Sequence, residues 1–562
     1  MASAQHRVVD HIVGYLARIG VDHIFGVGGA NIEDVFDAAH FRSDIEAVLA
    51  KHEFSAATMA DGYSRSGAGL GVVAATSGGG SLNIVPGLGE SLASRVPVLA
   101  LVGQPPTTMD GQGSFQDTSG RNGSLDAEAL FSAVSVFCRR VLTPAAAVAV
   151  LPQAIAAART GGPAVMLLPK DIQQASVVVN GNNRDTAGQS VRPRIDDSHP
   201  IVRALRCANG PITIIAGEQV ARDDARTELE ELRALLGARV ACVPDAKDVV
   251  GWWSTLGVTG VMGHPGVVDA VSASALCLVV GTRLSVTARA GLDDELAAVR
   301  TVSIGSAAPY VRCTHLHTDN LRVSLRELCG ALSGCGRPAG LRVPDAAPLT
   351  ELSPPACTGP GVRYRDAMAA LDGALPDDVD LVVDAGNVGA AAIHHLPIRR
   401  GGRFLVALGM GGMGYSFGAG IGMAFGRRRR TVVIAGDGAF FMHGMEVHTA
   451  VQYRLPVTFV LFNNNAHAMC LTREQLFYHD LYSYNRFRPS RLGAGLAAMF
   501  PGLTSRDATD IDGFSAALRV ALDVDGPSVV SVECAADEIP PFAPFLTHPM
   551  TKEDRFDVTA RP

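Results

Sequence analysis

Residues Gly436–Asn464 have the sequence GDGAFFMHGMEVHTAVQYRLPVTFVLFNN. The stretch begins directly after an apolar run, TVVIA (431–435), crosses a segment of helical character and enters a second apolar run, VTFVLF (457–462), which is followed by asparagines. This order predicts a strand, a helix and a second strand, with polar residues at both strand exits. Because ligands of open parallel sheets bind at the carboxyl ends of the strands, the pattern predicts an α/β domain with a ligand site at these exits.

The polar residues at the two exits are suited to a divalent cation. Mg²⁺ prefers oxygen ligands in an octahedron and keeps diphosphate oxygens and water as partners. Asp437 and Asn464 offer side-chain oxygens, the carbonyl of Ala466 offers a third, and Gly436 and Gly438 allow the backbone to approach a phosphate closely. The alternative is a β-α-β unit with an ordinary turn aspartate and two loop asparagines.

A second glycine pattern lies just upstream of this stretch. Residues 409–414 read GMGGMG, a GxGxxG match after the apolar run FLVAL, and Asp437 follows a little over 20 residues later. This arrangement is typical of a dinucleotide-binding unit. Two features oppose that interpretation: the acidic residue is itself part of Gly-Asp-Gly, and the asparagine pair has no role in nicotinamide binding.

Length and composition limit the class of protein. The chain has 562 residues, of which 47% are hydrophobic and 18% charged, so it predicts about three or four well-packed domains. A net charge of -7 gives no electrostatic footprint for nucleic acid. The run of four arginines at 427–430 lies between a helical segment and a strand, and we expect it to be a solvated turn.

The sequence also carries signals about the cell compartment. No unbroken apolar run reaches the roughly 18 residues of a membrane span, and the first residues lack the ordered regions of a signal peptide. The ten cysteines are scattered without a CxxC pair. Reduced, mostly buried thiols of this kind are typical of the cytoplasm.

The amino-terminal part has its own α/β pattern. A helix is expected at residues 6–20, and strands are expected at GVVAAT (71–76) and VPVLALVG (96–103), with helical segments between them. Glu53 falls where a strand gives way to a helix. A helix amino terminus stabilises an ionised carboxylate, so the simplest interpretation of Glu53 alone is an acid at a helix start.

A set of motifs in a fixed order changes that interpretation. HEFSAATMADGYSR (52–65), TSGGGSLN (76–83), VPVLALVGQPP (96–106) and LLPKDI (167–172) closely resemble acetohydroxyacid (acetolactate) synthases and their relatives. Gly-Asp-Gly, 24 intervening residues and Asn-Asn resemble the diphosphate signature of thiamine-diphosphate (ThDP) enzymes. The resemblance spans nearly the whole chain and weakens through the middle.

The resemblance implies an α/β fold of three doubly wound parallel-sheet domains. These are a pyrimidine-binding domain (1–180), a central domain (196–335) and a diphosphate- and Mg²⁺-binding domain (360–540), followed by a tail (541–562). Residues 177–200 and the stretch before residue 360 read as linkers.

The resemblance also assigns roles to individual residues. It implies that Glu53 is catalytic and hydrogen-bonds a pyrimidine ring nitrogen, and that Met413 supports the bend of the cofactor; the alternative for Met413 is a core-filling methionine. The other implied cofactor-binding residues are Gly386, Asn387, Gly411, Gly436, Asp437, Gly438, Ala439, Asn464 and Met469, and the metal ligands are Asp437, Asn464 and Ala466. The substrate-pocket candidates are Gly28, Phe115, Gln116, His467, Cys470 and Arg473. His467 is either a proton shuttle or a packing residue.

Two departures from the family pattern concern the acceptor substrate. Where relatives have Gln-Trp, this chain has Thr472-Arg473, and where relatives continue the central GxR motif with Phe-Asp-Asp-Arg, this chain reads LSVT (284–287). A buried anion without its arginine is expensive. A keto-acid acceptor therefore requires Arg473 or Arg289 in that role. The same departure leaves FAD binding open, because Gly281 and Arg283 remain but their neighbours differ.

These observations predict a ThDP- and Mg²⁺-dependent enzyme that decarboxylates a 2-keto acid, most simply pyruvate, and transfers the acyl unit to an acceptor. The rival within the class is a decarboxylase, or a carboligase with an aldehyde or keto-sugar acceptor; a non-catalytic ThDP-fold binding subunit is the rival from another class. The family arrangement implies a homodimer or homotetramer with active sites at the subunit interface. Neither nucleic acid nor a membrane is expected as a partner.

Overall fold

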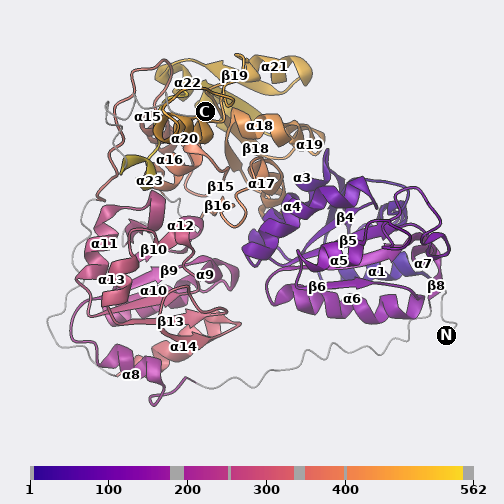
Figure 1. The fold of residues 1–562 in the computed structure, drawn as a ribbon, viewed down its shortest axis with the longest axis horizontal. Coiled ribbons are helices and arrows are strands. Elements are labelled where there is room, and N and C mark those ends of the chain that lie inside the picture. The colour runs from indigo at the N-terminus through magenta and orange to yellow at the C-terminus, as the bar shows by residue number, and fades with distance from the viewer. Residues whose placement is uncertain (1–5, 178–194, 251–254, 335–348, 398–400, 548–562) are drawn as a thin grey trace, which may run out of the picture.

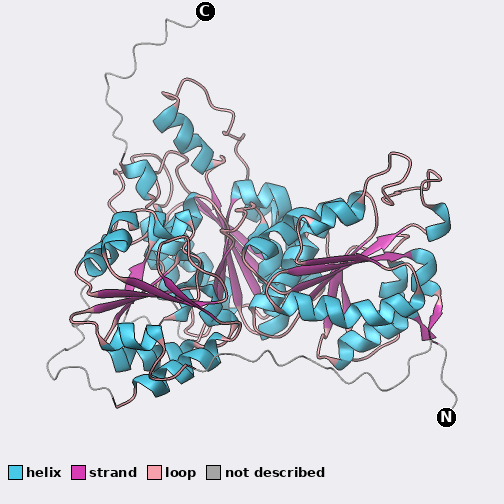
Figure 2. Cartoon of the chain, turned by 60° about the horizontal axis from the view of Figure 1, so that its bottom comes forward, coloured by secondary structure: helices cyan, strands magenta, loops and turns pink. Residues whose placement is uncertain are grey.

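The fold is built from three parallel sheets, one in each part of the chain (Figure 1). The computed structural model describes residues 6–177, 195–250, 255–334, 349–397 and 401–547. Each sheet has six strands, all paired in parallel, and helices lie on both sides of each sheet (Figure 2). The predicted α/β class with three doubly wound domains is therefore confirmed. Residues 178–194 of the predicted linker and 548–562 of the predicted tail lie outside the described residues.

The amino-terminal sheet has the strand order β3-β2-β4-β5-β7-β6. Its strands are β2 (His23–Gly26), β3 (Glu46–Leu49), β4 (Gly71–Ala75), β5 (Val98–Gln104), β6 (Phe137–Arg140) and β7 (Pro163–Pro169). The helices are α1 (Val8–Arg18), α2 (Glu33–His40), α3 (Glu53–Arg65), α4 (Gly79–Ala93), η1 (Thr107–Met109), α5 (Ala127–Ser132), α6 (Pro144–Arg159) and α7 (Lys170–Gln174). A short antiparallel pair, β1 (His6–Arg7) and β8 (Ser176–Val177), joins the two ends of this domain.

The central sheet has the strand order β11-β10-β9-β12-β13-β14. Its strands are β9 (Ile212–Ala216), β10 (Arg239–Cys242), β11 (Thr255–Val258), β12 (Leu276–Val280), β13 (Thr301–Gly305) and β14 (Thr314–His317). The helices are α8 (Pro200–Arg206), α9 (Glu218–Arg222), α10 (Arg226–Leu236), η2 (Pro244–Val249), η3 (Gly260–Met262), α11 (Pro265–Ser272), α12 (Val286–Arg289), α13 (Asp293–Ala298) and α14 (Leu321–Leu332). The fully buried runs of β9 and β12 form the centre of this sheet.

The carboxyl-terminal sheet has the strand order β16-β15-β17-β18-β20-β19. Its strands are β15 (Asp380–Val383), β16 (Phe404–Val406), β17 (Thr431–Gly436), β18 (Val457–Asn463), β19 (Thr504–Ala508) and β20 (Ser528–Glu533). The helices are α15 (Tyr364–Ala374), α16 (Asn387–His395), α17 (Tyr415–Arg427), α18 (Asp437–His443), η4 (Gly444–Glu446), α19 (Val447–Gln452), α20 (Ala468–Phe477), α21 (Leu492–Met499), α22 (Ile511–Asp523) and α23 (Ala543–Leu546). The two predicted apolar runs are the central strands β17 and β18.

Glycines allow α17 to lie directly on α3 and so join the first and third domains. A Cβ atom on Gly418 would lie 2.5 Å from the backbone oxygen of Ser55, and one on Gly422 would lie 2.0 Å from the backbone oxygen of Met59. These glycines repeat every four residues and therefore lie on one face of α17. Their lack of side chains brings the two backbones into contact and fixes the relative position of the two domains.

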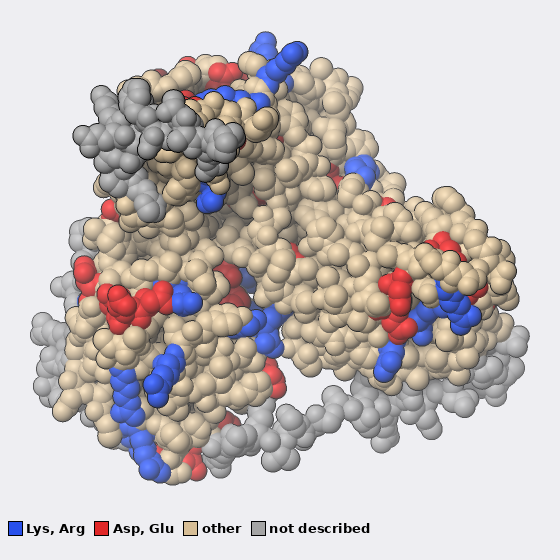
Figure 3. Space-filling model, viewed as in Figure 1, with Lys and Arg blue, Asp and Glu red and all other residues tan. Residues whose placement is uncertain are grey.

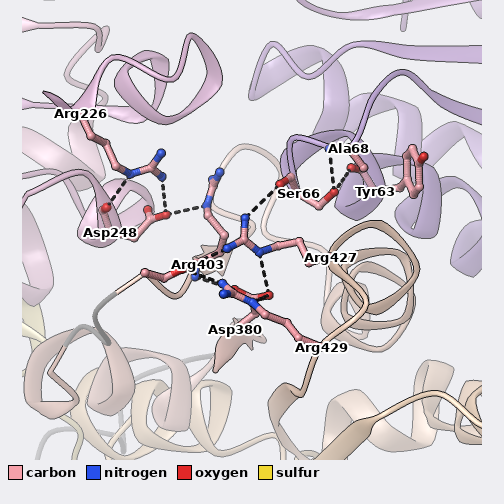
Figure 4. A network of polar contacts seen from close by, with 10 residues as sticks. Tyr63, Ser66, Ala68, Arg226, Asp248, Asp380, Arg403, Arg427 and Arg429 are labelled. Carbon is pink, nitrogen blue, oxygen red and sulfur yellow. Dashed lines mark hydrogen bonds and ion pairs between the residues drawn. The ribbon is translucent and has the colours of Figure 1, made fainter. Parts of the chain in front are cut away.

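A polar network joins all three domains and corrects the interpretation of the arginine run 427–430 (Figure 4). Arg427 and Arg429 both pair with Asp380, which is fully buried at the start of β15. Arg430 donates to the backbone oxygens of Val524 and Gly526. The expectation of a solvated turn was therefore wrong for these three arginines. The buried carboxylate of Asp380 needs the charge of Arg427 and Arg429, and Arg430 is held by backbone oxygens instead.

The surface carries no sign of a charged partner on the face shown in Figure 3. Lys and Arg side chains lie there in small groups beside Asp and Glu, without a continuous basic area. Among the described residues, every helix is too short or too polar to traverse a bilayer.

Candidate active site

A cavity lies at the carboxyl edge of the third sheet, where β15, β17 and β18 end. Most of the residues predicted to bind the cofactor meet there. The lining residues are Tyr364, Ala385, Gly386, Asn387, Val388, Met413, Gly436, Asp437, Gly438, Ala439, Phe462, Asn464, Ala466, His467, Ala468, Met469 and Cys470. We call this the diphosphate cavity.

Asp437 is the buried charge of the diphosphate cavity. It is 1% exposed, and neither of its carboxylate oxygens has a well-formed hydrogen bond among the described residues. Burial raises the pKa of Asp437 to about 6, and this rise is opposed in part by the backbone N–H groups of Gly438, Asn464 and Asn465. A buried carboxylate without a partner is costly, so the geometry leaves both oxygens available to a cation.

Asn464 lies beside Asp437 because β17 and β18 are paired in register. Gly436 is opposite Phe462 in this pair, so the residues that follow each strand emerge at the same edge. Asn464 donates from Nδ2 to the hydroxyl of Tyr364 at 3.3 Å, and its Oδ1 accepts from the backbone N–H of Ala466 at 3.0 Å. These two hydrogen bonds fix the orientation of the Asn464 amide. Its Oδ1 atom then lies in the loop that carries the predicted metal ligands.

The amino terminus of α16 forms another wall of the diphosphate cavity. Gly386 has a φ of +124°, a conformation that favours glycine, and immediately precedes the helix. The Oδ1 atom of Asn387 is buried and has no hydrogen-bond partner among the described residues. The free N–H groups at the start of a helix favour an anion, so this wall suits a phosphate group.

The Met413 loop is held by Asp384, which directly follows β15. The carboxylate of Asp384 accepts from the backbone N–H groups of Gly414 at 3.0 Å and Ser416 at 2.9 Å. Burial raises the pKa of Asp384. These bonds fix the turn before α17 and place Met413 at the cavity wall, where its side chain also packs against the core shared with the first domain.

Gly438 lies between the side chains of Met413 and His467. A Cβ atom there would lie 2.5 Å from His467 Nδ1 and 3.1 Å from Met413 Cε. The Nδ1 atom of His467 is buried and has no hydrogen-bond partner within the described part of the chain, and burial lowers the pKa of this histidine. The ring also packs edge-on against Phe487 at 4.7 Å between centroids. His467 therefore combines packing on one side with a free ring nitrogen at the cavity.

Glu53 belongs to a second cluster of residues, on the amino-terminal domain. It begins α3, and its Oε2 accepts from Asn83 Nδ2 at 2.9 Å. A Cβ atom on Gly80, in the first turn of α4, would lie 3.0 Å from Glu53 Oε1. The predicted pocket residue Gln116 lies near the start of α4, because its Oε1 accepts a hydrogen bond from Ser77 at 3.3 Å.

The remaining predicted residues fall outside the diphosphate cavity. Its described lining comes from the third domain alone, so Glu53, Gly28, Phe115 and Gln116 do not line it in a single chain, and neither do Gly411 and Arg473. Phe54, next to Glu53, stacks on His443 with 4.2 Å between centroids. His443 ends α18, whereas Asp437 begins it. One chain therefore carries two clusters of predicted site residues, one on the first domain and one on the third.

Tyr364 is the main lining residue that sequence reasoning missed. It is buried, and its hydroxyl accepts a hydrogen bond from Asn464, which lies one hundred positions later in the chain. Tyr364 is not part of any recognisable sequence motif. Burial raises the pKa of Tyr364 well above its usual value. No local signal could have identified it, because its role comes from the packing of α15 beside the sheet.

Comparison with known families agrees with this geometry in all three domains. Residues 6–124 match the thiamine pyrophosphate enzyme N-terminal TPP binding domain, residues 199–312 match the central domain, and residues 384–532 match the C-terminal TPP binding domain. The Gly-Asp-Gly and Asn-Asn residues thus lie in a TPP-binding domain, and the GMGGMG pattern upstream belongs to the same domain rather than to a nicotinamide-binding unit.

Curated relatives narrow the group further. The chain is 28% identical over 544 residues to the acetolactate synthase isozyme 2 large subunit of Escherichia coli strain K12, covering 93% of this chain and 94% of the relative. It is 27% identical to a probable acetolactate synthase large subunit of Methanocaldococcus jannaschii, covering 83% and 82%. It is also 27% identical to the chloroplastic acetolactate synthase 2 of Nicotiana tabacum, covering 93% and 81%. The chain therefore belongs to the thiamine-diphosphate enzymes and is an acetolactate synthase-like carboligase or transferase.

Proposed function

We propose that the protein is a Mg²⁺- and ThDP-dependent enzyme that decarboxylates a 2-keto acid, most simply pyruvate, and transfers the acyl unit to an acceptor. One observation carries this proposal: among the described residues no cation and no well-formed hydrogen bond meets the buried carboxylate of Asp437, which lies at a sheet edge that also presents a helix amino terminus. A cation and a diphosphate together would satisfy both features, because the cation neutralises the carboxylate and the phosphate oxygens.

The chain offers a set of hard oxygen ligands for the metal. Asp437 would bind through its carboxylate, Asn464 through Oδ1 and Ala466 through its backbone oxygen, all of which line the diphosphate cavity. Mg²⁺ usually takes few protein ligands and fills its octahedron with phosphate oxygens and water. Gly436, Gly438 and Ala439, at the start of α18, would leave the backbone open to the phosphate.

When bound, ThDP supplies the reactive carbon and the electron sink for decarboxylation of a keto acid. Met413 projects beside Gly438 and would support the bend of the cofactor, while Gly386, Asn387, Gly411 and Met469 would line its path. Glu53 would share a proton through its carboxylate with a pyrimidine nitrogen, the role of a positioned acid or base. Phe115, Gln116, Gly28, His467 and Cys470 would line the reaction chamber.

We also propose that a second copy of the chain completes each site. Glu53 does not line the cavity of its own chain, so Glu53 of one copy would meet Asp437 of another in a homodimer or a homotetramer. Large apolar side chains at the domain surfaces support this: Phe115 is 81% exposed and Met410 is 64% exposed, and Phe441 and Met442 of α18 are about half exposed. Exposed apolar groups of this size favour burial at a protein interface.

A second candidate function concerns the acceptor. No lysine or arginine lies among the described residues that line the diphosphate cavity. Arg289 pairs with Asp293, and Arg473 lies over the ring of Phe477 at 5.3 Å. A keto-acid acceptor brings a carboxylate that needs a cation. The arrangement therefore favours an aldehyde or keto-sugar acceptor, or plain decarboxylation, over a second keto acid.

The test is product analysis with the full chain. The protein is supplied with ThDP, Mg²⁺ and pyruvate, first alone and then with a panel of keto acids, aldehydes and keto sugars. Acetolactate from pyruvate alone supports the first candidate; acetaldehyde, or a product only with an aldehyde or sugar, supports the second. Failure to bind ThDP and Mg²⁺ in calorimetry overturns both and favours a non-catalytic binding subunit.

A cavity at the carboxyl edge of the central sheet bears on the question of flavin binding. A cavity of about 430 Å³ lies there between the three domains, and Glu218 and Asp245 line it. Burial, and then the charge of Asp245, raise the pKa of Glu218 to about 7. The same cavity is also lined by four arginines, Arg65, Arg159, Arg222 and Arg403, so its charge does not exclude the diphosphate of FAD. The absorption spectrum of the purified protein decides whether a flavin is bound.

The state of the cysteines supports activity in the cytoplasm. All nine cysteines within the described residues are free, but only Cys242, Cys277 and Cys534 are buried, so the expectation of mostly buried thiols was wrong. Burial raises the pKa of both Cys242 and Cys277 to about 12, so these thiols stay protonated and unreactive at neutral pH.

A further inference from the structure

Lys247 is a buried lysine that connects the central domain to the third domain. It lies in η2, and the residue is 5% exposed. Its Nζ atom donates to the backbone oxygens of Ile393 at 2.6 Å, Leu396 at 2.6 Å and Ala392 at 3.2 Å. These three carbonyls form the carboxyl-terminal end of α16. A side chain from one domain therefore caps a helix of another.

These contacts match what a helix end requires, and one of the three oxygens, that of Ala392, also accepts from the backbone N–H of Leu396 at 3.2 Å. The last carbonyls of an α-helix have no partner within the helix, and a lysine ammonium has three donors and no acceptor. Positive charge also stabilises the carboxyl-terminal end of the helix dipole. In addition, Lys247 Nζ lies 4.9 Å from the centre of the Phe404 ring, a favourable cation–π distance.

The other end of α16 forms part of the diphosphate cavity. Gly386, Asn387 and Val388 line that cavity, while Lys247 holds the end that lies about 13 Å away along a nine-residue helix. We propose that Lys247 is a positioning residue for the cofactor: by fixing the carboxyl-terminal end of α16, it holds the amino-terminal end against the diphosphate. This inference rests on the proposed function, in which the cavity binds a diphosphate.

The surroundings of Lys247 affect its protonation state. Burial lowers the pKa of Lys247 to about 8. The groups around it are His394 and His395 of α16, His264 before α11, Cys242 of β10, Glu351 beside His395, and Asp248, which pairs with Arg226 and Arg403 (Figure 4). Burial lowers the pKa of His264 to about 3 and that of His394 to about 4, so both are neutral near pH 7.

These surroundings predict how the cofactor affinity varies with pH. Cys242, with a pKa near 12, stays a neutral thiol, and Asp248 is already paired with two arginines. Loss of the proton from Lys247 would remove the charge at the helix end and one of its three donors. The affinity for Mg²⁺·ThDP should therefore fall by up to about 10-fold between about pH 7 and pH 9, one unit above the pKa of Lys247.

The test measures binding of Mg²⁺·ThDP to the full-length apoprotein by calorimetry at both pH values. Lys247→Met should bind at least about 10-fold more weakly at pH 7 and should show no further loss at pH 9. Arg226→Met is the matched control. It removes one ion-pair partner of Asp248, the residue that follows Lys247 in η2, and leaves Arg403 and α16 untouched. Its affinity and pH profile should follow the wild type.

Two results would overturn the inference: a folded Lys247→Met protein with wild-type affinity, or a wild-type affinity that does not change between the two pH values. If the methionine variant does not fold, Lys247→Gln decides, since it keeps two donors without a charge and should still give a weaker, pH-independent affinity. A wild-type protein that binds no ThDP at pH 7 instead contradicts the proposed function.

Discussion

Asp437 and Asn464 lie at the same edge of the third sheet because Gly436 of β17 is paired with Phe462 of β18. One residue follows its strand directly and begins α18, and the other follows the end of β18. Parallel register thus brings together two side chains that are separated by a whole β-α-β unit. This relationship predicts that the carboxylate and the amide act on one ligand.

The Asp437→Asn variant should lose the cofactor. Replacing the carboxylate by an amide of the same shape removes the negative charge that a hard cation needs. We expect binding of Mg²⁺·ThDP to weaken by about 100-fold or more. Loss of a residue that only supports a metal ligand already costs about 10- to 100-fold in affinity, and loss of the ligand itself should cost at least as much. Calorimetry on the apoprotein measures this directly. Asp512→Asn, at an exposed position of α22, is the control and should bind normally.

The same substitution should stabilise the apoprotein at neutral pH. Burial raises the pKa of Asp437 from 3.8 to about 6, so the folded state favours the protonated acid. The free energy of unfolding therefore falls as the pH rises from about 3.8 to about 6, and the loss is complete above pH 6. The cost corresponds to about 1–3 kcal/mol. Thermal unfolding without Mg²⁺ should therefore give a higher Tm for Asp437→Asn than for the wild type at pH 7.5, with the difference vanishing near pH 4. An unchanged or lower Tm at pH 7.5 would contradict a buried, unpaired charge.

Cofactor binding should weaken in acid for the same reason. A metal needs the ionised form of Asp437, and the fraction of that form falls as the pH decreases through about 6. The affinity of the apoprotein for Mg²⁺·ThDP should therefore drop about 10-fold for each unit below that pKa. Calorimetry between about pH 7 and pH 5 tests this. A constant affinity over that range would show that Asp437 is not a ligand.

The sequence predicted the elements of the third domain well because its signals are local. The apolar runs before Asp437 and Asn464 are β17 and β18, and the cavity lies at their predicted exits. Tyr364 and Lys247 could not be predicted, because each acts on a residue about 100 or more positions away through packing between elements. Arg427 and Arg429 were misinterpreted for the same reason: their partner, Asp380, is identified only by the fold.

Glu53 should be needed for turnover more than for binding. Its carboxylate would share a proton with the pyrimidine ring, whereas the metal site lies on the other domain. We expect Glu53→Gln to retain Mg²⁺·ThDP binding within a few fold and to lose roughly 100-fold or more in rate, the usual scale for a positioned acid or base. Steady-state rates with pyruvate, measured at saturating cofactor, test this. Glu46→Gln, at an exposed position before α3, serves as the control.

Mixing two inactive variants decides whether the site is shared between chains. Glu53→Gln disables the cluster on the first domain, and Asp437→Asn disables the diphosphate cavity on the third domain. If Glu53 of one copy meets Asp437 of another, a mixed dimer contains one site with both substitutions and one site with neither. Co-expression with two different affinity tags, followed by purification through both, should therefore restore about half of the wild-type rate per dimer. If each chain carries a complete site of its own, every site in the mixed dimer keeps one substitution and the rate stays at the level of the single variants. The size of the purified complex, measured on the same sample, shows that both chains are present and separates failed assembly from a site confined to one chain.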